Sequence, residues 1–266
     1  MADYSITYNG TSSESLGLIV TNKPCPAAAM LTYTDNVVPG RDGSLYTFDG
    51  SVSDIAVTVS FAFKGTTEAQ VHEKYYKAKA WLLQQLTYKP YLTTEGIYVI
   101  NTENNVIDLA MSGERMLSFS DDTEGFYRVK YVSVDTSERI AKLTGMMEAT
   151  FICQGYRYLV SSARFYPRSH IALTNDYQLC KPIYKLVGDA RYDITTNGKL
   201  FRVNATGTTY VDSEQMITFR DDGTICNADA TGDYESLWYL PGTNTQTATA
   251  STAGCYIYVM PRRRTL

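Results

Sequence analysis

The sequence has few of the residues on which enzymes and nucleotide-binding proteins depend. It contains two histidines, His72 and His170, and neither lies beside a serine or cysteine in a nucleophile motif. The phosphate-binding motifs GxxxxGK[ST] and GxGxxG do not occur. A catalytic triad and a nucleotide-dependent activity are therefore not expected, and we predict no catalytic residue and no cofactor.

Cysteine is also scarce. The five cysteines are odd in number, far apart in the sequence and never arranged as CxxC (Cys25, Cys153, Cys180, Cys226 and Cys255). Such spacing indicates neither a disulfide framework nor a zinc site. We expect buried free thiols and no bound metal.

The chain lacks an excess of positive charge and any long apolar run. It has 24 Lys and Arg against 28 Asp and Glu, a net charge of −4, which is the wrong sign for a protein that neutralises DNA phosphates. No stretch approaches the roughly 20 apolar residues that span a bilayer. The first residues, MADYSITYNG, lack the basic and apolar regions of a secretory signal. We expect a protein made in a cytosol, without a membrane partner.

Tyrosine, by contrast, is abundant, and the hydrophobic pattern is mainly that of strands. There are 22 tyrosines against two tryptophans, which is typical of β-sheets and of interfaces. The segment IAVTVSFAF, 55–63, alternates strictly and predicts a half-buried strand. The next segment changes to a helical period and predicts one helix at 68–86, with Thr67 and Gln70 as its capping box.

From residue 96 onward the signals are nearly all β. The sequence breaks its alternation near residue 165, where we place a domain boundary. In the second half, Asn197-Gly198 joins two alternating runs and predicts a two-residue hairpin in which Asp193 lies opposite Arg202. The Thr- and Ala-rich stretch 241–255 is expected to be a mobile loop.

Two charged groups allow more than one interpretation. Asp212 and Glu214 in VDSE, with Asp221 and Asp222 at the next turn, could form a hydrolase pair or a cation site, although carboxylates at strand ends are usually solvated. The terminal PRRRTL could contact an anionic surface, lie in solvent or anchor a neighbouring subunit, and the sequence leaves these open.

One short turn is unusually constrained. The segment VVPGRDGSL, 37–45, combines a proline that fixes φ with glycines that permit unusual backbone geometry, and with an Arg-Asp pair that can form hydrogen bonds (Pro39, Gly40, Arg41, Asp42 and Gly43). Such a turn can hold an extended segment in one orientation.

The order of several motifs resembles the distal tail protein family of long-tailed bacteriophages. The similarity rests on YNGTSSESLGLIV, VVPGRDGSLY, the helix ending in Trp81-Leu82, LSFSDDTEGFYRVKYVSV, EATFICQGYRY, TYVDSE and LWYLPGTNT. Two features depart from the family. Gly155 stands where the family often has proline, and the segment 93–113 contains additional residues that predict an added hairpin or protrusion.

The resemblance implies a mainly β fold of two β-sandwich domains. Residues 1–164 would be the ring-forming tail domain, with the single helix at its side. Residues 165–266 would be a galectin-like or carbohydrate-module-like sandwich. In this family VDSE is part of the structural pattern, so Asp212 and Glu214 gain an explanation without catalysis.

The resemblance also implies a function. The chain would be a structural protein at the distal tip of the phage tail, assembled in the cytoplasm of the bacterial host. It would form a homo-hexameric ring around a channel for passing DNA. The ring would join the tail tube protein to the tail-associated hub protein. Residues 24–46 would either lock neighbouring subunits together or staple their own sandwich.

Two competing functions remain open at this stage. The second sandwich could itself be an adhesin that binds host cell-wall glycan, with Trp238 and Tyr239 as contact residues, and not a platform that holds a receptor-binding protein. A glycoside hydrolase using Asp212, Glu214 or Asp221 is the other alternative.

Overall fold

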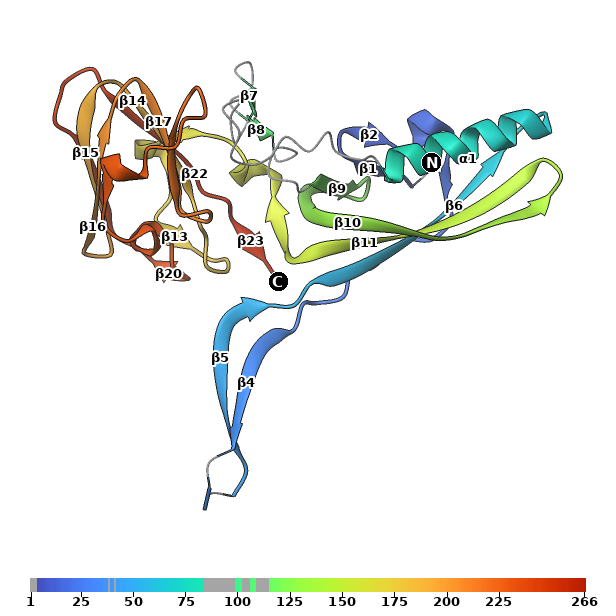
Figure 1. Ribbon diagram of the computed structural model, residues 1–266, viewed down its shortest axis with the longest axis horizontal. Coiled ribbons are helices and arrows are strands. Elements are labelled where there is room, and N and C mark those ends of the chain that lie inside the picture. Colours follow the sequence, from blue (N-terminus) through green and yellow to red (C-terminus); the bar gives the residue numbers. More distant parts are fainter. Residues whose placement is uncertain (1–3, 38, 41, 84–98, 102–105, 109–114) are drawn as a thin grey trace.

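The fold is mainly β, with a single α-helix and a long arm that projects from the body (Figure 1). This computed structural model describes residues 4–37, 39–40, 42–83, 99–101, 106–108 and 115–266. The prediction of a mainly β chain with one helix beside the first sheet is confirmed.

The first part of the chain forms one strongly curled antiparallel sheet. Its strand order is β2-β1-β9-β10-β11-β6-β3, and β23 from the carboxyl end also pairs with β11. The two ends of the sheet share one core, because Ile6 and Tyr8 pack in the same cluster as Val59 and Phe61. The strands are β1 (Ile6–Tyr8), β2 (Thr11–Ser12), β3 (Ile19–Val20), β6 (Ile55–Lys64), β9 (Arg115–Phe119), β10 (Asp122–Ala141), β11 (Thr144–Leu159) and β23 (Arg264–Thr265).

The alternating segment 55–63 lies in β6, where its five apolar side chains are buried as predicted (Ile55, Val57, Val59, Phe61 and Phe63). Helix α1 (Glu68–Leu82) begins where predicted and covers this core with four buried residues (Val71, Ala78, Trp81 and Leu82). The helix ends at Leu82, before the predicted end, and residues 84–86 lie outside the described part.

The capping box of α1 differs slightly from the expected pattern. Thr67 Oγ1 accepts a hydrogen bond from the Gln70 backbone N–H at 3.3 Å, as predicted. The side chain of Gln70, however, accepts from the N–H of Thr66 at 2.9 Å rather than from that of Thr67. The side chains of Thr67 and Gln70 therefore still both form hydrogen bonds with backbone N–H groups at the start of the helix.

The second part of the chain forms a sandwich of two antiparallel sheets. One has the order β12-β22-β14-β17-β18 and the other β19-β16-β15-β21, while β13 pairs separately with β20. Tyr184 and Leu186 of the first sheet pack on Ile194 and Phe201 of the second. The strands are β12 (Tyr166–Pro167), β13 (Thr174–Asn175), β14 (Ile183–Val187), β15 (Ala190–Thr196), β16 (Lys199–Ala205), β17 (Thr208–Asp212), β18 (Ile217–Arg220), β19 (Ala230–Thr231), β20 (Gly242–Thr243), β21 (Gln246–Ala250) and β22 (Tyr256–Met260).

The sheets change from one set to the other between Leu159 and Tyr166. The domain boundary near residue 165 stays a prediction, and the pairing of β23 with β11 shows that the carboxyl end returns to the first sheet. Short 3-10 helices occur at η1 (Glu14–Leu16), η3 (Val160–Ser162), η4 (Arg168–His170), η5 (Asn227–Asp229) and η6 (Tyr234–Leu237).

The hairpin β15–β16 has the register predicted from its turn. Asp193 pairs with Arg202, and Ile194 with Phe201. Asn197 and Gly198 have φ values of 50° and 79°, as a type I′ turn requires. The charged pair is joined at 2.7 Å, while Ile194 and Phe201 are buried on the opposite face.

Three sequence-based expectations differ from the structure or fall partly on residues that it does not describe. The stretch 241–255 is not simply a loop, because Gln246–Ala250 forms β21 on the edge of a sheet, where threonine packs well. The cysteines are free, but Cys25 is exposed because it precedes the arm, outside the core, and Cys255 is only half-buried. Within 93–113, β7 (Val99–Asn101) and β8 (Val106–Asp108) form an antiparallel pair, and the rest of that segment lies outside the described residues.

Candidate functional site

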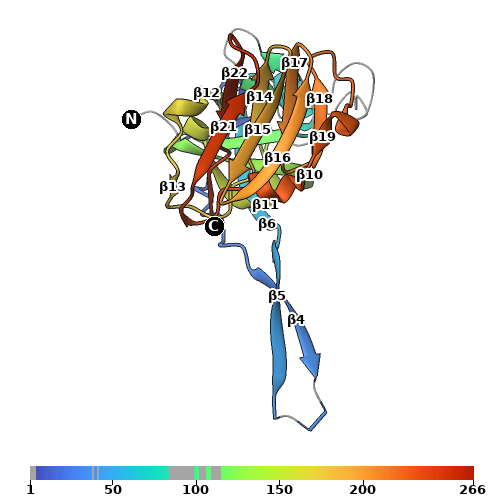
Figure 2. The same ribbon diagram turned by 90° about the vertical axis from the view of Figure 1, so that its left-hand side faces the viewer.

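The constrained turn lies at the tip of the projecting arm. The arm consists of β4 (Leu31–Val37) and β5 (Ser44–Val52), which pair only with each other in the described part of the chain (Figures 1 and 2). Gly40 and Gly43 have φ values of 81° and 79°, a region that favours glycine. The turn therefore reverses a long hairpin and does not staple a sandwich. Arg41 lies outside the described residues, so its predicted pairing with Asp42 stays a prediction.

The two faces of the arm differ in chemistry. Residues paired across an antiparallel ladder share a face, so Tyr33, Tyr46 and Val37 lie on one face. The same face also carries Asp35, which pairs with Tyr46, while Thr34, Thr47 and Leu45 lie on the other face. The side chains of Val37 and Tyr46 are 82% and 66% exposed, and Tyr33 is 51% exposed. Apolar and aromatic groups gathered in this way on an exposed element are typical of a protein interface.

The base of the arm docks on β11. Ser53 N–H donates to the Met30 carbonyl at 2.8 Å, and Met30 N–H donates to Ser53 Oγ at 3.0 Å, which closes the base. Gly155 of β11 lies directly beneath it. A Cβ at this position would overlap the Ser53 carbonyl oxygen and lie 2.5 Å from the Ala29 Cβ. Glycine therefore allows the arm to approach the sheet closely.

The carboxylates of VDSE lie at the junction between the two parts of the body. Asp212 is fully buried and accepts two hydrogen bonds from the Arg262 guanidinium, at 2.9 and 3.1 Å. Glu214 accepts from Arg128 of β10 at 2.8 Å and from Arg262 at 3.2 Å. Arg262 has a left-handed φ of 52°, which is costly for a non-glycine residue. The strained backbone places its guanidinium between both carboxylates.

The ion pairs decide the protonation of Glu214. Burial alone would raise its pKa, but the guanidinium groups of Arg128, Arg262 and Arg264 lower the pKa to about 2. A glycosidase acid needs a raised pKa, so Glu214 does not fit that role. Asp221 accepts a hydrogen bond from the Tyr210 hydroxyl at 3.2 Å. The arrangement is that of structural ion pairs.

The carboxyl-terminal arginines belong to the same junction. Arg264 is buried, lies 3.9 Å from the centre of the Tyr156 ring and donates from Nε to the Leu179 carbonyl at 2.8 Å. Its strand β23 pairs with β11. Of the three interpretations of PRRRTL, a solvated tail is therefore wrong for Arg262 and Arg264, because the chain's own junction binds them.

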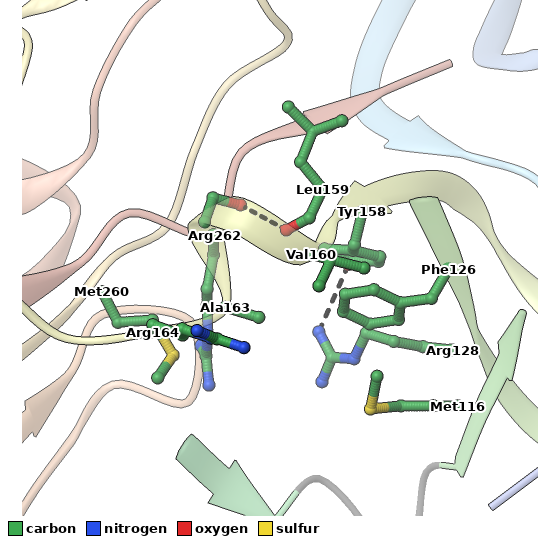
Figure 3. A pocket seen from close by; sticks show the side chains of 11 residues that line it. Met116, Phe126, Arg128, Tyr158, Leu159, Val160, Ala163, Arg164, Met260 and Arg262 are labelled. Atoms are coloured by element: carbon green, nitrogen blue, oxygen red, sulfur yellow. Dashed lines mark hydrogen bonds between the residues drawn. The ribbon is translucent and has the colours of Figure 1, made fainter. Parts of the chain in front are cut away.

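A small cavity lies beside these ion pairs. Figure 3 shows Met260 and Arg262 on one side of it and Phe126, Arg128 and Met116 on the other. Its volume is about 150 Å³, and its lining is mainly apolar. Residues from both parts of the body therefore line the cavity. In its wall, Arg128 donates to the Tyr158 hydroxyl at 3.2 Å.

The two residues predicted to bind glycan or a partner differ in exposure. Tyr239 is 3% exposed, and its hydroxyl bonds to Gln246 Oε1 at 3.1 Å, so it is a core residue and does not reach the surface. Trp238 is half-buried. Its indole N–H donates to the Ser213 carbonyl at 3.1 Å, and the Lys181 ammonium lies 4.5 Å from the ring centre. The indole N–H and the ring of Trp238 are therefore already in contact with other residues of the chain.

No family model and no curated protein sequence matches the chain. A solved structure is nevertheless similar over 99% of this chain and 99% of its own, with a TM-score of 0.63 and 14% sequence identity. It is described as "Crystal Structure of SPP1 Dit (gp 19.1) Protein, a Paradigm of Hub Adsorption Apparatus in Gram-positive Infecting Phages". The chain has the fold of SPP1 Dit. The mainly β, Dit-like fold expected from the family resemblance is therefore confirmed, and the galectin-like character of the second sandwich stays a prediction.

The described part of the chain has neither a candidate metal site nor a membrane-spanning helix. Among the described residues, no group of three or more His, Cys, Asp or Glu side chains could hold a metal ion. The single helix of the described chain is too short and too polar to cross a membrane.

Sequence reasoning missed the projection of the arm and the partner of Glu214. The signal for the junction was present, since two carboxylates in VDSE and three arginines in PRRRTL are of opposite charge. Arg128 had no such signal, because it lies 86 residues from Glu214 in the chain.

Proposed function

We propose that this protein is a structural component of a bacteriophage tail tip, related in role to SPP1 Dit, and that it carries out no catalysis. Its fold matches that protein over nearly the whole of both chains, which supports a place in the adsorption apparatus of the virion. The carboxylates that could have formed a hydrolase pair are neutralised by arginines, which supports a non-enzymatic role.

The observation that carries the proposal is the exposed aromatic face of the arm. A two-stranded hairpin is marginal on its own in water, and this one exposes Tyr33, Val37 and Tyr46 along its length. Burial of that face against the next copy would remove apolar area from water. Repeated head-to-tail around a closed axis, such a contact forms a ring. We propose a hexameric ring.

The ring would join the tail tube protein to the tail-associated hub protein and leave a channel through which DNA passes. Assembly would take place in the cytoplasm of the bacterial host. A net charge of −4 disfavours adhesion to the passing DNA. The carboxyl-terminal sandwich would face outward as a platform for a receptor-binding protein.

The oligomeric state of arm variants tests this proposal. We expect native mass spectrometry of the full chain to give a ring of identical 29.7 kDa subunits, and electron microscopy to show its lumen. The double substitution Tyr33→Ser and Tyr46→Ser should abolish the ring and leave a folded monomer, because both residues lie on the apolar face.

The matched control changes the opposite face of the same hairpin. Thr34→Ser and Thr47→Ser together should leave the ring intact, since they keep the hydroxyls and remove only methyl groups. A wild-type chain that remains monomeric at high concentration would contradict the proposal. Rings that form equally well with both double variants would show that the aromatic face is not the contact.

A further inference from the structure

Strand β21 is an edge strand of the carboxyl-terminal sandwich. It pairs with β15, and in the described chain the four-stranded sheet ends there (Figure 2). Its five residues, QTATA, contain no charge and no proline, and its pairing with β15 has no bulge. Charges, prolines and bulges are the devices by which proteins usually keep such edges from pairing with another chain.

Two backbone hydrogen bonds show which groups of β21 are open. The Ser251 N–H donates to the Arg191 carbonyl, and the Thr245 carbonyl accepts from the Asn197 N–H, both at 2.8 Å. The backbone groups of Thr245 and Ser251 therefore face β15. The backbone groups of successive residues point to opposite sides of a strand. The N–H and C=O groups therefore point away from β15 at the three even-numbered residues of β21 (Gln246, Ala248 and Ala250). Arg168 confirms this geometry, since its Nη2 donates to the Gln246 carbonyl at 2.9 Å.

Three other sheet edges are short or covered by other parts of the chain. The outer side of β18 is covered, because the backbone carbonyl of Thr218 accepts from the Cys226 N–H at 2.8 Å and the backbone N–H of Thr218 donates to Asn227 Oδ1 at 2.7 Å. Along β6, the side chain of Asn22 bonds to Ser60 N–H at 2.7 Å. The edge strand β12 is two residues long and includes Pro167. By contrast, β21 is five residues long and carries none of these devices.

A groove of about 690 Å³ runs beside this edge, between the margins of the two sheets. Ala248 and Ala250 line one side, and Ile257 and the 58%-exposed Tyr256 line the other. The described lining contains no carboxylate and one cation, Arg168, at the Gln246 end. The groove therefore suits apolar side chains along its length and a negative charge at one end.

The side chain of Gln246, which also lines the groove, already has its hydrogen-bond partners within the chain. Gln246 Nε2 donates to Tyr184 and to Thr196, at 2.6 and 2.7 Å, while Gln246 Oε1 accepts from Tyr239. The open groups are those of the backbone, which another backbone matches at strand spacing.

We infer that the β21 edge is a docking site for an extended segment of a partner protein, which adds a strand to the sheet. The segment has apolar side chains at alternate positions, directed into the groove, and a carboxylate next to Arg168. The inference goes beyond the tail-tip role and does not depend on ring formation, since β21 lies in the body of the protein and the arm projects away from it (Figure 2).

The substitution Ala248→Pro tests the edge directly. Proline removes the N–H that points away from β15 and keeps the β15 ladder, so the fold should persist. The probe is the acetylated peptide TVTVTD, aligned antiparallel so that its valines lie opposite Ala250 and Ala248 and its aspartate lies opposite Gln246, beside Arg168. We expect saturable shifts of the Ala248 and Ala250 amide signals in the wild-type chain. Binding to Ala248→Pro should be weaker by on the order of tenfold or more.

Methylated peptides supply a control that leaves the protein unchanged. Residues opposite Ala248 and Ala250 share their inward direction, so the valines of the peptide also supply the paired N–H groups. N-methylation of the valines should abolish binding, and N-methylation of the threonines should not. Equal binding of both methylated peptides, or none by the parent peptide, overturns the inference. Cell-wall oligosaccharides that shift the same signals while the peptide does not would also overturn it.

Discussion

At the scale of single residues, the best-defined feature is the buried cluster that joins Glu214 to Arg128, Arg262 and Arg264. Its side chains come from both parts of the body. A buried ion pair adds little net stability compared with a well-packed apolar substitute, but breaking one by removing a partner is costly. The cluster therefore makes the junction sensitive to a change in any one member.

Substitution of Glu214 by glutamine should lower the free energy of unfolding at pH 7 by about 3 kcal/mol, because it leaves buried guanidinium groups without their anion. Denaturant unfolding of the full chain measures this. Glu235→Gln is the matched control, since Glu235 is exposed, and it should change stability by less than about 0.5 kcal/mol. Equal effects of the two substitutions would contradict the role of the cluster.

The same cluster predicts acid lability. The pKa of Glu214 is about 2 in the folded chain against 4.5 as the ordinary value, so its contribution is fully present above about pH 4.5. It should be lost as the pH falls from there towards 2. Unfolding measured across this range should show a steeper loss of stability in the wild-type chain than in Glu214→Gln. Parallel curves would contradict the assignment.

At the scale of elements, the sequence predicted local structure well and tertiary placement poorly. The turn Asn197-Gly198 determined the register of β15–β16, because turn geometry and cross-strand charge agree there. The segment β21 was missed because its polar, uncharged composition resembles that of a loop. The arm was recognised as a rigid turn, but alternation alone does not reveal that a hairpin leaves the body.

The turn of β15–β16 supports a direct test. Gly198 has a φ of 79°, and no atom lies within 4 Å of the position that an added Cβ would take, so Gly198→Ala adds backbone strain without a clash. It should lower the free energy of unfolding by about 1–2 kcal/mol. Lys199→Ala, one residue later and exposed, is the control. A Gly198→Ala protein as stable as the control would show that the turn has another conformation.

At the scale of the whole molecule, the carboxyl-terminal segment returns across the junction and ties the two parts of the body together. Strand β23 adds to the first sheet, and Arg128 reaches Glu214 from the other side. Sequence reasoning could not find this connection, since it joins residues that are distant in the chain and depends on how the sheets pack.

Loss of the junction should uncouple the two parts. Arg128→Met should separate the thermal unfolding, followed by calorimetry, into two transitions or broaden it, because Glu214 then lacks its β10 partner. Lys130→Met is a close control on the same strand. Its ion pair with Asp54 is about 42% exposed on both sides and should matter little. Identical traces for both variants would contradict the coupling.

The central claim is that this chain is built into the distal end of a phage tail. Immunogold electron microscopy of intact particles, with antibody against the full chain, tests it most directly. The account predicts label at the tail extremity, on the side of the tube away from the head. Particles that lack the chain, or that carry it on the head or along the tube, would contradict the account.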